Sequence, residues 1–261
     1  MRQLLALAFI VSPSSSKAQS LASLLTTSPL YNTTRPEDAD ILVGLGGDGF
    51  MLRTLHTYQS LNKPVYGINC GTVGFLMNDQ PPSPDDLLQR LKSAVSTPLH
   101  PLKMTAYTDD GTFTHHAINE VSLLRETPQA AKIRILINQV ERLPLFVGDG
   151  LIVATPAGST AYNLSAQGPI LPLESSLIAL TPLSAFRPRR WRGALLPQSA
   201  HVCLEILEAD RRHVSATADD QTVPKVNRVD ICQDLGLCYW LLFDPGHNLE
   251  ERILKEQFMN A

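Results

Sequence analysis

The chain has few cysteines and no long apolar segment. Its four cysteines, in 261 residues, include no C-x-x-C pair. A chain of this length can bury a core without disulfides, so we expect reduced thiols, as in a cytoplasmic protein. The longest apolar run, Leu4–Val11, has eight residues, whereas a membrane-spanning helix needs about 20. No membrane span is therefore predicted.

The same apolar run follows Arg2 and could imitate a secretory signal. A signal peptide ends at an Ala-x-Ala-like cleavage site, and the following Ser14–Ala18 segment, SSSKA, is a poor match to one. We therefore prefer to interpret the run as a buried strand that enters a helix through a serine-rich cap.

The chain also lacks an excess of positive charge. It has 22 Lys and Arg against 25 Asp and Glu, which gives a net charge of −3. Non-specific binding to nucleic acid or to an anionic membrane needs a positive excess, so neither partner is expected. Apolar residues, by contrast, make up 44% of the chain, a content that excludes a disordered protein.

The first hundred residues alternate short apolar runs with helical patterns, which is typical of a parallel sheet covered on both faces. Asp85 and Asp86 are expected to cap the last of the helices. The predicted strands are 4–11, 40–45 and 65–68, and the predicted helices are 17–25, 50–61 and 87–95.

After Pro101 the apolar residues recur with period two, which indicates antiparallel strands. The predicted strands are 103–108, 112–124, 132–140, 151–154, 201–207, 213–218 and 228–232, followed by a closing strand 238–243 and a helix 247–258. We therefore predict an α/β N-terminal domain with a mostly parallel sheet and a mostly antiparallel all-β C-terminal domain. The first comprises residues 1–100, joined by the segment 238–261, and the second comprises residues 101–237.

A glycine-rich segment lies where a predicted strand leads into a predicted helix. Gly44–Gly49 reads GLGGDG, which fits the dinucleotide-binding pattern G-x-G-x-x-G of Rossmann folds. That pattern expects an acid about 20 residues further on, but no Asp or Glu occurs from Phe50 to Asn78. Asp48 would repel a phosphate unless a metal ion intervenes or its carboxylate takes a proton from an attacking hydroxyl. A glycine turn with a surface aspartate is the alternative.

Two later segments combine polar groups with turns. Asn119 and Glu120 supply donors and acceptors that can read an adenine edge and a ribose hydroxyl; a polar turn between two strands is the alternative. Asp149 stands between two glycines, and Gly158–Thr160 opens a short helix. The N–H groups and hydroxyls of such a helix start suit a nucleotide, although a helix capped by Ser159 or Thr160 needs no ligand.

These segments, in this order, resemble the NAD kinase family, in the superfamily of the diacylglycerol kinases and phosphofructokinases. The resemblance spans nearly the whole chain. It implies transfer of the γ-phosphoryl group of ATP to the 2′-hydroxyl of the adenosine ribose of NAD, giving NADP. The residues that carry it are GGDG at 46–49, GINCGTVGFL at 67–76, Asn119–Glu120, and the segment 149–169 with its TPAGSTAY motif.

The resemblance also implies roles for single residues. Asp48 is the general base, and Gly49 lets the backbone approach the substrate. For Arg53, which would reach a phosphate, a solvated helix charge is an equal alternative. The other implied contacts with the dinucleotide are Phe75 near adenine, Asn119 and Glu120 on adenine and ribose, Asp149 at the nicotinamide end, Ala157, Thr160, Ala161, Tyr162 and Ser165 as a cradle, and Gln221 as a late polar contact.

The implied ligands are NAD, NADP and ATP, and Mg²⁺ or another divalent cation is expected to enter with ATP. No residue is predicted as a metal ligand. The family suggests a homodimer or homotetramer. Two alternatives share the scaffold: a lipid kinase of the diacylglycerol type and a non-catalytic NADP-binding regulator. Asn119–Glu120 and Tyr162 favour a dinucleotide over a lipid, and Asp48 argues against a pure binder.

A last cluster is not explained by these motifs. Arg187–Arg192 contains four arginines in six residues. A solvated surface loop is one interpretation. The other is phosphate binding, because guanidinium groups pair with phosphate oxygens, and many family members carry Lys or Arg where Val147–Gly148 stands here. We predict that Arg189→Ala or Arg190→Ala weakens NADP binding more than NAD binding.

Overall fold

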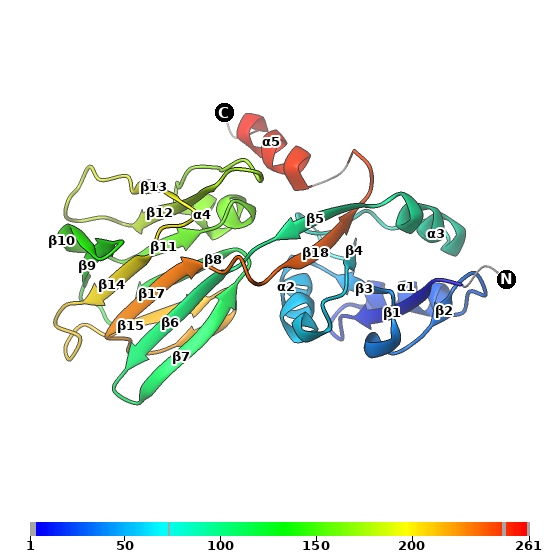
Figure 1. The fold of residues 1–261 in the computed structure, drawn as a ribbon, viewed down its shortest axis with the longest axis horizontal. Helices are drawn as coiled ribbons and strands as arrows, with labels where there is room; N and C mark the ends of the chain where they lie inside the picture. Colours follow the sequence, from blue (N-terminus) through cyan, green and yellow to red (C-terminus); the bar gives the residue numbers. More distant parts are fainter. Residues whose placement is uncertain (1–3, 73, 247–248, 260–261) are drawn as a thin grey trace. The chain divides into compact units, whose positions relative to one another are not determined.

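A computed structural model describes residues 4–72, 74–246 and 249–259. The chain divides into two compact units (Figure 1). Unit 1 comprises Met1–Leu99 and Cys238–Arg252, and unit 2 comprises His100–Leu237 and Ile253–Ala261. The predicted fold class is confirmed: unit 1 is α/β with a mostly parallel sheet, and unit 2 is built from antiparallel β-sheets.

Unit 1 contains one six-stranded sheet in the order β2-β1-β3-β4-β18-β5. All neighbours run parallel except β5, which is antiparallel to β18. In Figure 1 the orange-red strand β18, from near the end of the chain, lies beside the cyan strand β4. The strands are β1 (Ala6–Val11), β2 (Asn32–Thr33), β3 (Ile41–Gly46), β4 (Val65–Asn69), β5 (Val95–Leu99) and β18 (Tyr239–Phe243).

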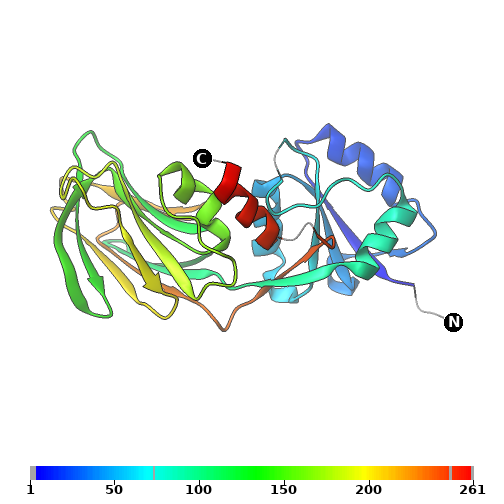
Figure 2. The same cartoon turned by 90° about the horizontal axis from the view of Figure 1, so that it is seen from above.

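Helices cover both faces of this sheet, as Figure 2 shows for α2 on one side and α1 and α3 on the other. The apolar strands explain this arrangement, because β3 is buried along its whole length and needs cover on both faces. Leu25 of α1 and Leu87 of α3 share one core cluster with Val43. The helices of unit 1 are α1 (Ser16–Leu25), α2 (Asp48–Thr57) and α3 (Pro84–Ser93), with 3₁₀ turns η1 (Pro36–Asp38) and η2 (Gln59–Leu61). The C-terminal helix α5 (Leu249–Met259) is divided between the two units after Arg252.

Two details of the predicted helices were wrong. Helix α3 is capped by Ser83, whose hydroxyl accepts the Asp86 N–H at 3.2 Å, so Asp85 and Asp86 lie inside the first turn instead of capping it. The predicted helix 50–61 begins two residues earlier, at Asp48, and ends at Thr57. The chain then continues as the 3₁₀ turn η2, whose C-cap residue, Asn62, has a left-handed backbone. Residues 247–248 of the predicted C-terminal helix lie outside the described residues.

Unit 2 contains two six-stranded sheets, ordered β10-β9-β14-β17-β6-β7 and β13-β12-β11-β8-β15-β16. Inward side chains of both sheets form a single apolar core, for example Ile133, Leu151 and Val229. The strands are β6 (Leu102–Thr108), β7 (Gly111–Ala117), β8 (Glu120–Arg125), β9 (Ala131–Ile137), β10 (Val140–Gly148), β11 (Gly150–Ala154), β12 (Leu177–Leu183), β13 (Ala194–Pro197), β14 (Val202–Ile206), β15 (Val214–Ala218), β16 (Gln221–Val223) and β17 (Arg228–Gln233).

Two predicted strands of unit 2 were too long. The run 112–124 is divided into β7 and β8, which belong to different sheets, because the chain changes sheet at Ile118–Asn119. The run 132–140 ends at Ile137, since Asn138 and Gln139 form a turn with φ of 52° and 66°. The strands β2, β5, β10, β12, β13 and β16 of the two units were not predicted. No helix among the described residues is long and apolar enough to cross a membrane.

Candidate functional site

The loop after β3 presents Asp48 at the first position of α2. The Gly47 carbonyl accepts the Met51 N–H at 3.0 Å, which closes the first turn. The Asp48 carboxylate accepts two backbone N–H groups from the segment after β4: Phe75 donates to Oδ2 and Leu76 to Oδ1, both at 2.8 Å. One bond to each oxygen fixes the carboxylate and leaves lone pairs for a further proton.

The segment that holds Asp48 is itself tied to distant parts of unit 1. Arg252 of α5 donates through Nη1 to the carbonyls of Gly74 and Phe75, and burial lowers the pKa of its guanidinium. Fully buried Asn78 donates through Nδ2 to the Leu242 carbonyl at 2.9 Å. Arg252 and Asn78 were not predicted from the sequence, because these bonds join positions 178 and 164 residues apart.

The glycines beside Asp48 face open space. A Cβ placed on Gly47 or Gly49 would meet no heavy atom within 4 Å, so packing within the described chain does not require glycine there. Arg53 lies exposed one turn further along α2, and no ion pair to it is found in the described part of the chain. Phe75 is half-buried beside Asp48.

In unit 2, Asn119 lies in the connection between β7 and β8, and Glu120 opens β8. The carboxylate of Asp219 accepts the N–H groups of Ile118 and Asn119 at 2.7 and 2.9 Å. Asp219, which was not predicted from the sequence, stands in the hairpin between β15 and β16 with a φ of 50°. Gln221 lies exposed two residues further on, where its Nε2 donates to a neighbouring aspartate at 3.1 Å.

The chain after β11 packs against the same connection. Thr155 donates its N–H to the Asn119 carbonyl at 2.9 Å and its hydroxyl to the Ile118 carbonyl at 2.7 Å. A Cβ on Gly158 would lie 2.1 Å from the Asn119 carbonyl oxygen. The backbone of Asn119 is therefore fixed from two sides, while its side-chain amide makes no hydrogen bond within the part of the chain described.

Glu120 is the candidate residue with the most perturbed titration. Burial, together with the nearby Asp219 carboxylate, raises the pKa of Glu120 to about 8, against a smaller lowering effect of a backbone hydrogen bond from Tyr162. Its Oε2 atom is buried and has no hydrogen-bond partner in the described chain. A carboxyl group in this environment favours its protonated form at neutral pH, so it can donate a hydrogen bond as well as accept one.

Asp149 is paired, which the sequence did not predict. Arg125 donates through Nε to Asp149 Oδ1 at 2.6 Å and through Nη1 to the Thr127 carbonyl at 2.6 Å. The glycines on either side of Asp149 have a packing reason. A Cβ on Gly150 would lie 1.8 Å from the Leu123 carbonyl oxygen, and one on Gly148 would lie 2.9 Å from the carbonyl oxygen at the end of β12.

The predicted cradle is a 3₁₀ turn, η3 (Ala157–Thr160), followed by the single-turn helix α4 (Tyr162–Ser165). Neither Ser159 nor Thr160 caps a helix with its side chain. Instead the Ser159 hydroxyl faces inward, where it donates to the Pro156 carbonyl at 2.7 Å and accepts the Leu171 N–H at 3.0 Å. Of the predicted cradle residues, Ala157 is buried, Thr160 and Ala161 are half-buried, and Tyr162 and Ser165 are exposed.

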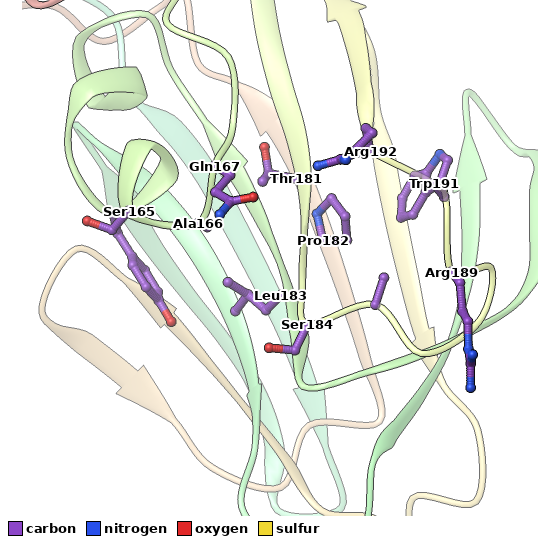
Figure 3. Close-up of a pocket in the computed structure, with 12 residues that line it drawn as sticks. Ser165, Ala166, Gln167, Thr181, Pro182, Leu183, Ser184, Arg189, Trp191 and Arg192 are labelled. Carbon is purple, nitrogen blue, oxygen red and sulfur yellow. The ribbon is translucent and has the colours of Figure 1, made fainter. Parts of the chain in front are cut away.

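A cavity of about 510 Å³ lies within unit 2 (Figure 3), a size typical of small-molecule sites. Two residues of the predicted cradle, Tyr162 and Ser165, line it. Arg189 and Arg192, from the unexplained arginine cluster, also line it. The remaining lining residues are Ala166, Gln167, Thr181, Pro182, Leu183, Ser184, Ala185 and Trp191.

Among the described residues, no group of three or more His, Cys, Asp or Glu side chains could hold a metal ion. Near Asp48, both carboxylate oxygens already accept backbone N–H groups. The described side chains around Asp48 therefore do not form a preformed metal-binding site. They are compatible with a Mg²⁺ ion that is bound mainly through substrate phosphates and water.

Comparison with known proteins gives matches over nearly the whole chain. The ATP-NAD kinase N-terminal domain family matches residues 3–94, and the ATP-NAD kinase C-terminal domain family matches residues 118–232. An NAD kinase of Rhizobium meliloti is 52% identical over 260 residues, covering 99% of both chains. An NAD kinase of Caulobacter vibrioides is 55% identical over 231 residues, covering 87% of each.

Solved structures share the fold at lower identity. Yeast NADH kinase, solved in complex with NADH, has a TM-score of 0.81 at 21% identity and covers 100% of this chain and 90% of its own. An NAD kinase from Archaeoglobus fulgidus, solved with ATP, has a TM-score of 0.72 at 22% identity and covers 97% of each chain. With the two domain families and the close relatives, these matches show that the chain belongs to the NAD kinase family.

Proposed function

We propose that this chain is an NAD kinase, which transfers the γ-phosphoryl group of ATP to the 2′-hydroxyl of the adenosine ribose of NAD. The observation that carries this function is the Asp48 carboxylate, fixed at the start of α2 by two backbone N–H groups between two open glycines. The relatives reported above are NAD kinases at 52% and 55% identity, which favours this activity over a lipid kinase or a non-catalytic regulator.

In the proposed reaction, Asp48 acts as the general base. The 2′-oxygen of the ribose forms a bond to the γ-phosphorus as the bond from that phosphorus to the β,γ-bridging oxygen breaks, and ADP leaves. The proton of the 2′-hydroxyl moves to an Asp48 oxygen, which has a free lone pair beside its backbone hydrogen bond. Because the N–H groups of Phe75 and Leu76 hold the carboxylate, it is already oriented when the proton is transferred.

We assign recognition of adenine and ribose to Asn119 and Glu120. The Asn119 amide has no hydrogen bond in the described chain, so its donors and acceptor remain for a ligand. The buried Oε2 of Glu120 also lacks a partner there, which a ribose hydroxyl would satisfy. Phe75, Tyr162, Ser165, Ala157, Thr160 and Ala161 complete the proposed dinucleotide contacts, with Arg53 for a phosphate, Asp149 for the nicotinamide end and Gln221 as a further polar contact.

The remaining parts of the proposal concern the divalent cation, the roles of the two domains, the oligomeric state and the cellular compartment. Mg²⁺ bound to the ATP phosphates supplies positive charge that stabilises the transferring phosphoryl group. We assign nucleotide binding to residues 1–100 with 238–261, NAD binding to residues 101–237, and a homodimer or homotetramer to the assembly. The four free cysteines favour a reducing compartment, so we place the protein in the cytoplasm.

The activity can be tested directly. The purified chain is incubated with NAD, ATP and Mg²⁺, and NADP is measured with a dehydrogenase that accepts only NADP. We expect NADP to accumulate with the wild-type chain and to be lost with Asp48→Asn, which keeps the shape of the side chain but cannot take the proton. NADP formation by both proteins at equal rates would exclude the proposed mechanism, and formation by neither would exclude the activity.

A further inference from the structure

The arginine cluster at 187–192 has no acidic partner. All four of its arginines are exposed in the loop between β12 and β13, and none forms an ion pair within the described chain. Arg187 and Arg189 lie instead over the exposed Phe186 ring, 5.7 and 5.3 Å from its centroid. Four like charges in one loop repel one another, and a bound anion would offset this repulsion.

Most other arginines of the described chain do have acidic partners. Seven of them form ion pairs with carboxylates at 2.6–3.6 Å, and even the most exposed, Arg35 and Arg211, pair with a neighbouring Asp. The seven are Arg35, Arg90, Arg125, Arg134, Arg211, Arg212 and Arg228. The chain carries more acids than bases, so a shortage of carboxylates does not explain the unpaired cluster.

The loop between β12 and β13 that carries the four arginines is attached to the rest of unit 2 at three points. At its start, Arg187 pairs with Val147 through backbone bonds of 2.8 and 3.0 Å. In its middle, Trp191 packs edge-on against buried Phe146, with 5.8 Å between ring centroids. At its end, Gly193 has a φ of 97° and approaches β12 so closely that a Cβ would lie 2.0 Å from a carbonyl oxygen of that strand. These three contacts attach the loop to unit 2 at its start, middle and end.

Two of the arginines line the 510 Å³ cavity. In Figure 3 the Arg192 side chain points toward Thr181 and Gln167, whereas the Arg189 side chain, at the edge of the cavity, extends away from Arg192 and Trp191. The cavity is also lined by two serines, and no described Asp or Glu is among its lining residues. Hydroxyls, an amide and two guanidinium groups are the donors that bind phosphate oxygens.

We propose that this cavity is a phosphate-binding site, in which Arg189 and Arg192 bind the phosphate groups of a nucleotide-sized anion. The volume exceeds what one phosphate fills, and the exposed Tyr162 ring offers an apolar surface for the rest of the ligand. Because Tyr162 and Ser165 also belong to the proposed dinucleotide contacts, the phosphates can come from the dinucleotide or from a separate phosphate compound. Only the assignment of the phosphates to the dinucleotide rests on the proposed function. The phosphate-binding site itself does not rest on it.

A tryptophan in the cavity allows binding to be measured. The chain has two tryptophans; Trp191 lines the cavity and Trp240 lies in β18. In a Trp240→Phe background, fluorescence reports on Trp191 alone while inorganic pyrophosphate is added at low salt. We expect saturable binding that weakens at high salt. Arg192→Gln and Arg189→Gln should each weaken it by about tenfold, as expected for a lost charge-assisted contact.

A matched control lies in the same loop. The sequence alone grouped Arg190 with Arg189 as a phosphate ligand, but Arg190 does not line the cavity. Arg190→Gln should therefore change the pyrophosphate affinity by less than about threefold, through long-range charge alone. Equal loss in all three variants would reduce the site to a diffuse basic patch. Unchanged affinity in the Arg189→Gln, Arg192→Gln double variant, or no saturable binding, would overturn the proposal.

The source of the phosphate is separated by competition. If pyrophosphate is displaced by NADP, and the double variant loses NADP affinity more than NAD affinity, the dinucleotide provides the phosphates. If pyrophosphate and NADP bind together, the cavity takes a separate phosphate compound. These titrations need no turnover, so a chain without kinase activity would still show the site, and an active kinase could still lack it.

Discussion

Asp48 in unit 1 and Asp149 in unit 2 each stand between two glycines. The two motifs look alike in sequence, but the surroundings of their glycines differ. Around Asp48, a Cβ on Gly47 or Gly49 would meet nothing within 4 Å. Around Asp149, a Cβ on Gly150 would lie 1.8 Å from a carbonyl oxygen. The first motif therefore leaves the backbone open, and the second brings two backbones into contact.

This difference separates the two uses of glycine in a binding protein. Open glycines leave room for a ligand to approach the main chain, so their replacement should affect function more than stability. Closed glycines permit a close approach that any side chain would block, so their replacement should affect stability first. Gly158, which lies against the Asn119 carbonyl, belongs to the closed class although it stands inside a motif that suggests a ligand.

The strongest effect is predicted at the open motif. Asp48→Asn should lower the turnover number by about 10²–10⁴-fold, as removal of a general base does, and leave the affinity for NAD within a few-fold. The amide keeps an oxygen for one of the two N–H groups of Phe75 and Leu76, but its NH2 group faces the other donor. The free energy of unfolding should therefore fall by about 1 kcal/mol or more. Steady-state kinetics with NAD and ATP, together with calorimetric titration of NAD, measure both. A turnover number within a few-fold of wild type would remove Asp48 from the base role.

Two matched substitutions test the contrast between open and closed glycines. Gly150→Ala should lower the free energy of unfolding by about 1–3 kcal/mol or more, the usual cost of overpacking. Gly49→Ala, inside α2, should leave it unchanged or raise it by up to about 1 kcal/mol, while kinase activity falls because the new methyl group fills the open space. Urea denaturation and the NADP assay measure the two effects.

The opposite results would contradict this contrast. If Gly49→Ala retained full activity, the open space beside Asp48 would not be used by a ligand. If Gly150→Ala were as stable as the wild type, the close approach of Gly150 to Leu123 would not be rigid. In that case the glycines beside Asp149 would need a functional explanation after all.

Most of the fold could be predicted from local patterns in the sequence. Continuous apolar runs predicted the parallel strands β1, β3 and β4, and alternation predicted β6, β14, β15 and β17. The longest of the missed strands, β10, contains Pro144 and the exposed side chains of Val140 and Leu145. A proline cannot donate a hydrogen bond to a sheet, and the pairing of β10 with β9 shifts register on either side of Leu143. These irregularities interrupt the alternation by which a strand is recognised.

The candidate site was less predictable, because its contacts join distant segments. The motifs pointed to Asp48, to Asn119–Glu120 and to the cradle, but they gave no sign of the groups that fix them. Asp219 accepts N–H groups about 100 residues away in the sequence, and Arg252 reaches a loop 178 residues away. The ion pair of Asp149 was also hidden, since a sequence shows charges but not which of them meet.

A third prediction concerns how stability depends on pH through the buried carboxyl group of Glu120 in unit 2. The packing of this region raises the pKa of Glu120 from an ordinary value of 4.5 to about 8. Between these values the folded chain keeps a proton that the unfolded chain has lost, so the free energy of unfolding should fall as the pH rises through this window. Each unit of difference in pKa is worth about 1.4 kcal/mol.

Glu120→Gln removes this titration while keeping the neutral shape. Urea denaturation of both proteins at pH 5 and pH 8 isolates the contribution, because all other titrating groups are shared. We expect the wild type to lose stability relative to the variant as the pH rises. A difference between the two proteins that is the same at both pH values would show that Glu120 titrates normally, and that the region is more open to water than its packing indicates.

The weakest effect is predicted at Asn119, where a fixed backbone carries a free side chain. Asn119→Ala should raise the KM for NAD by about two- to tenfold, the cost of one good hydrogen bond, and leave the turnover number nearly unchanged, since this contact exists in both the ground and transition states. Stability should change little, because Asp219 and Thr155 bind only the Asn119 backbone. Asn227→Ala is the matched control: it loses a hydrogen bond to Asp109 and should leave the KM unchanged. A turnover number that collapsed at constant KM would move Asn119 from recognition to catalysis.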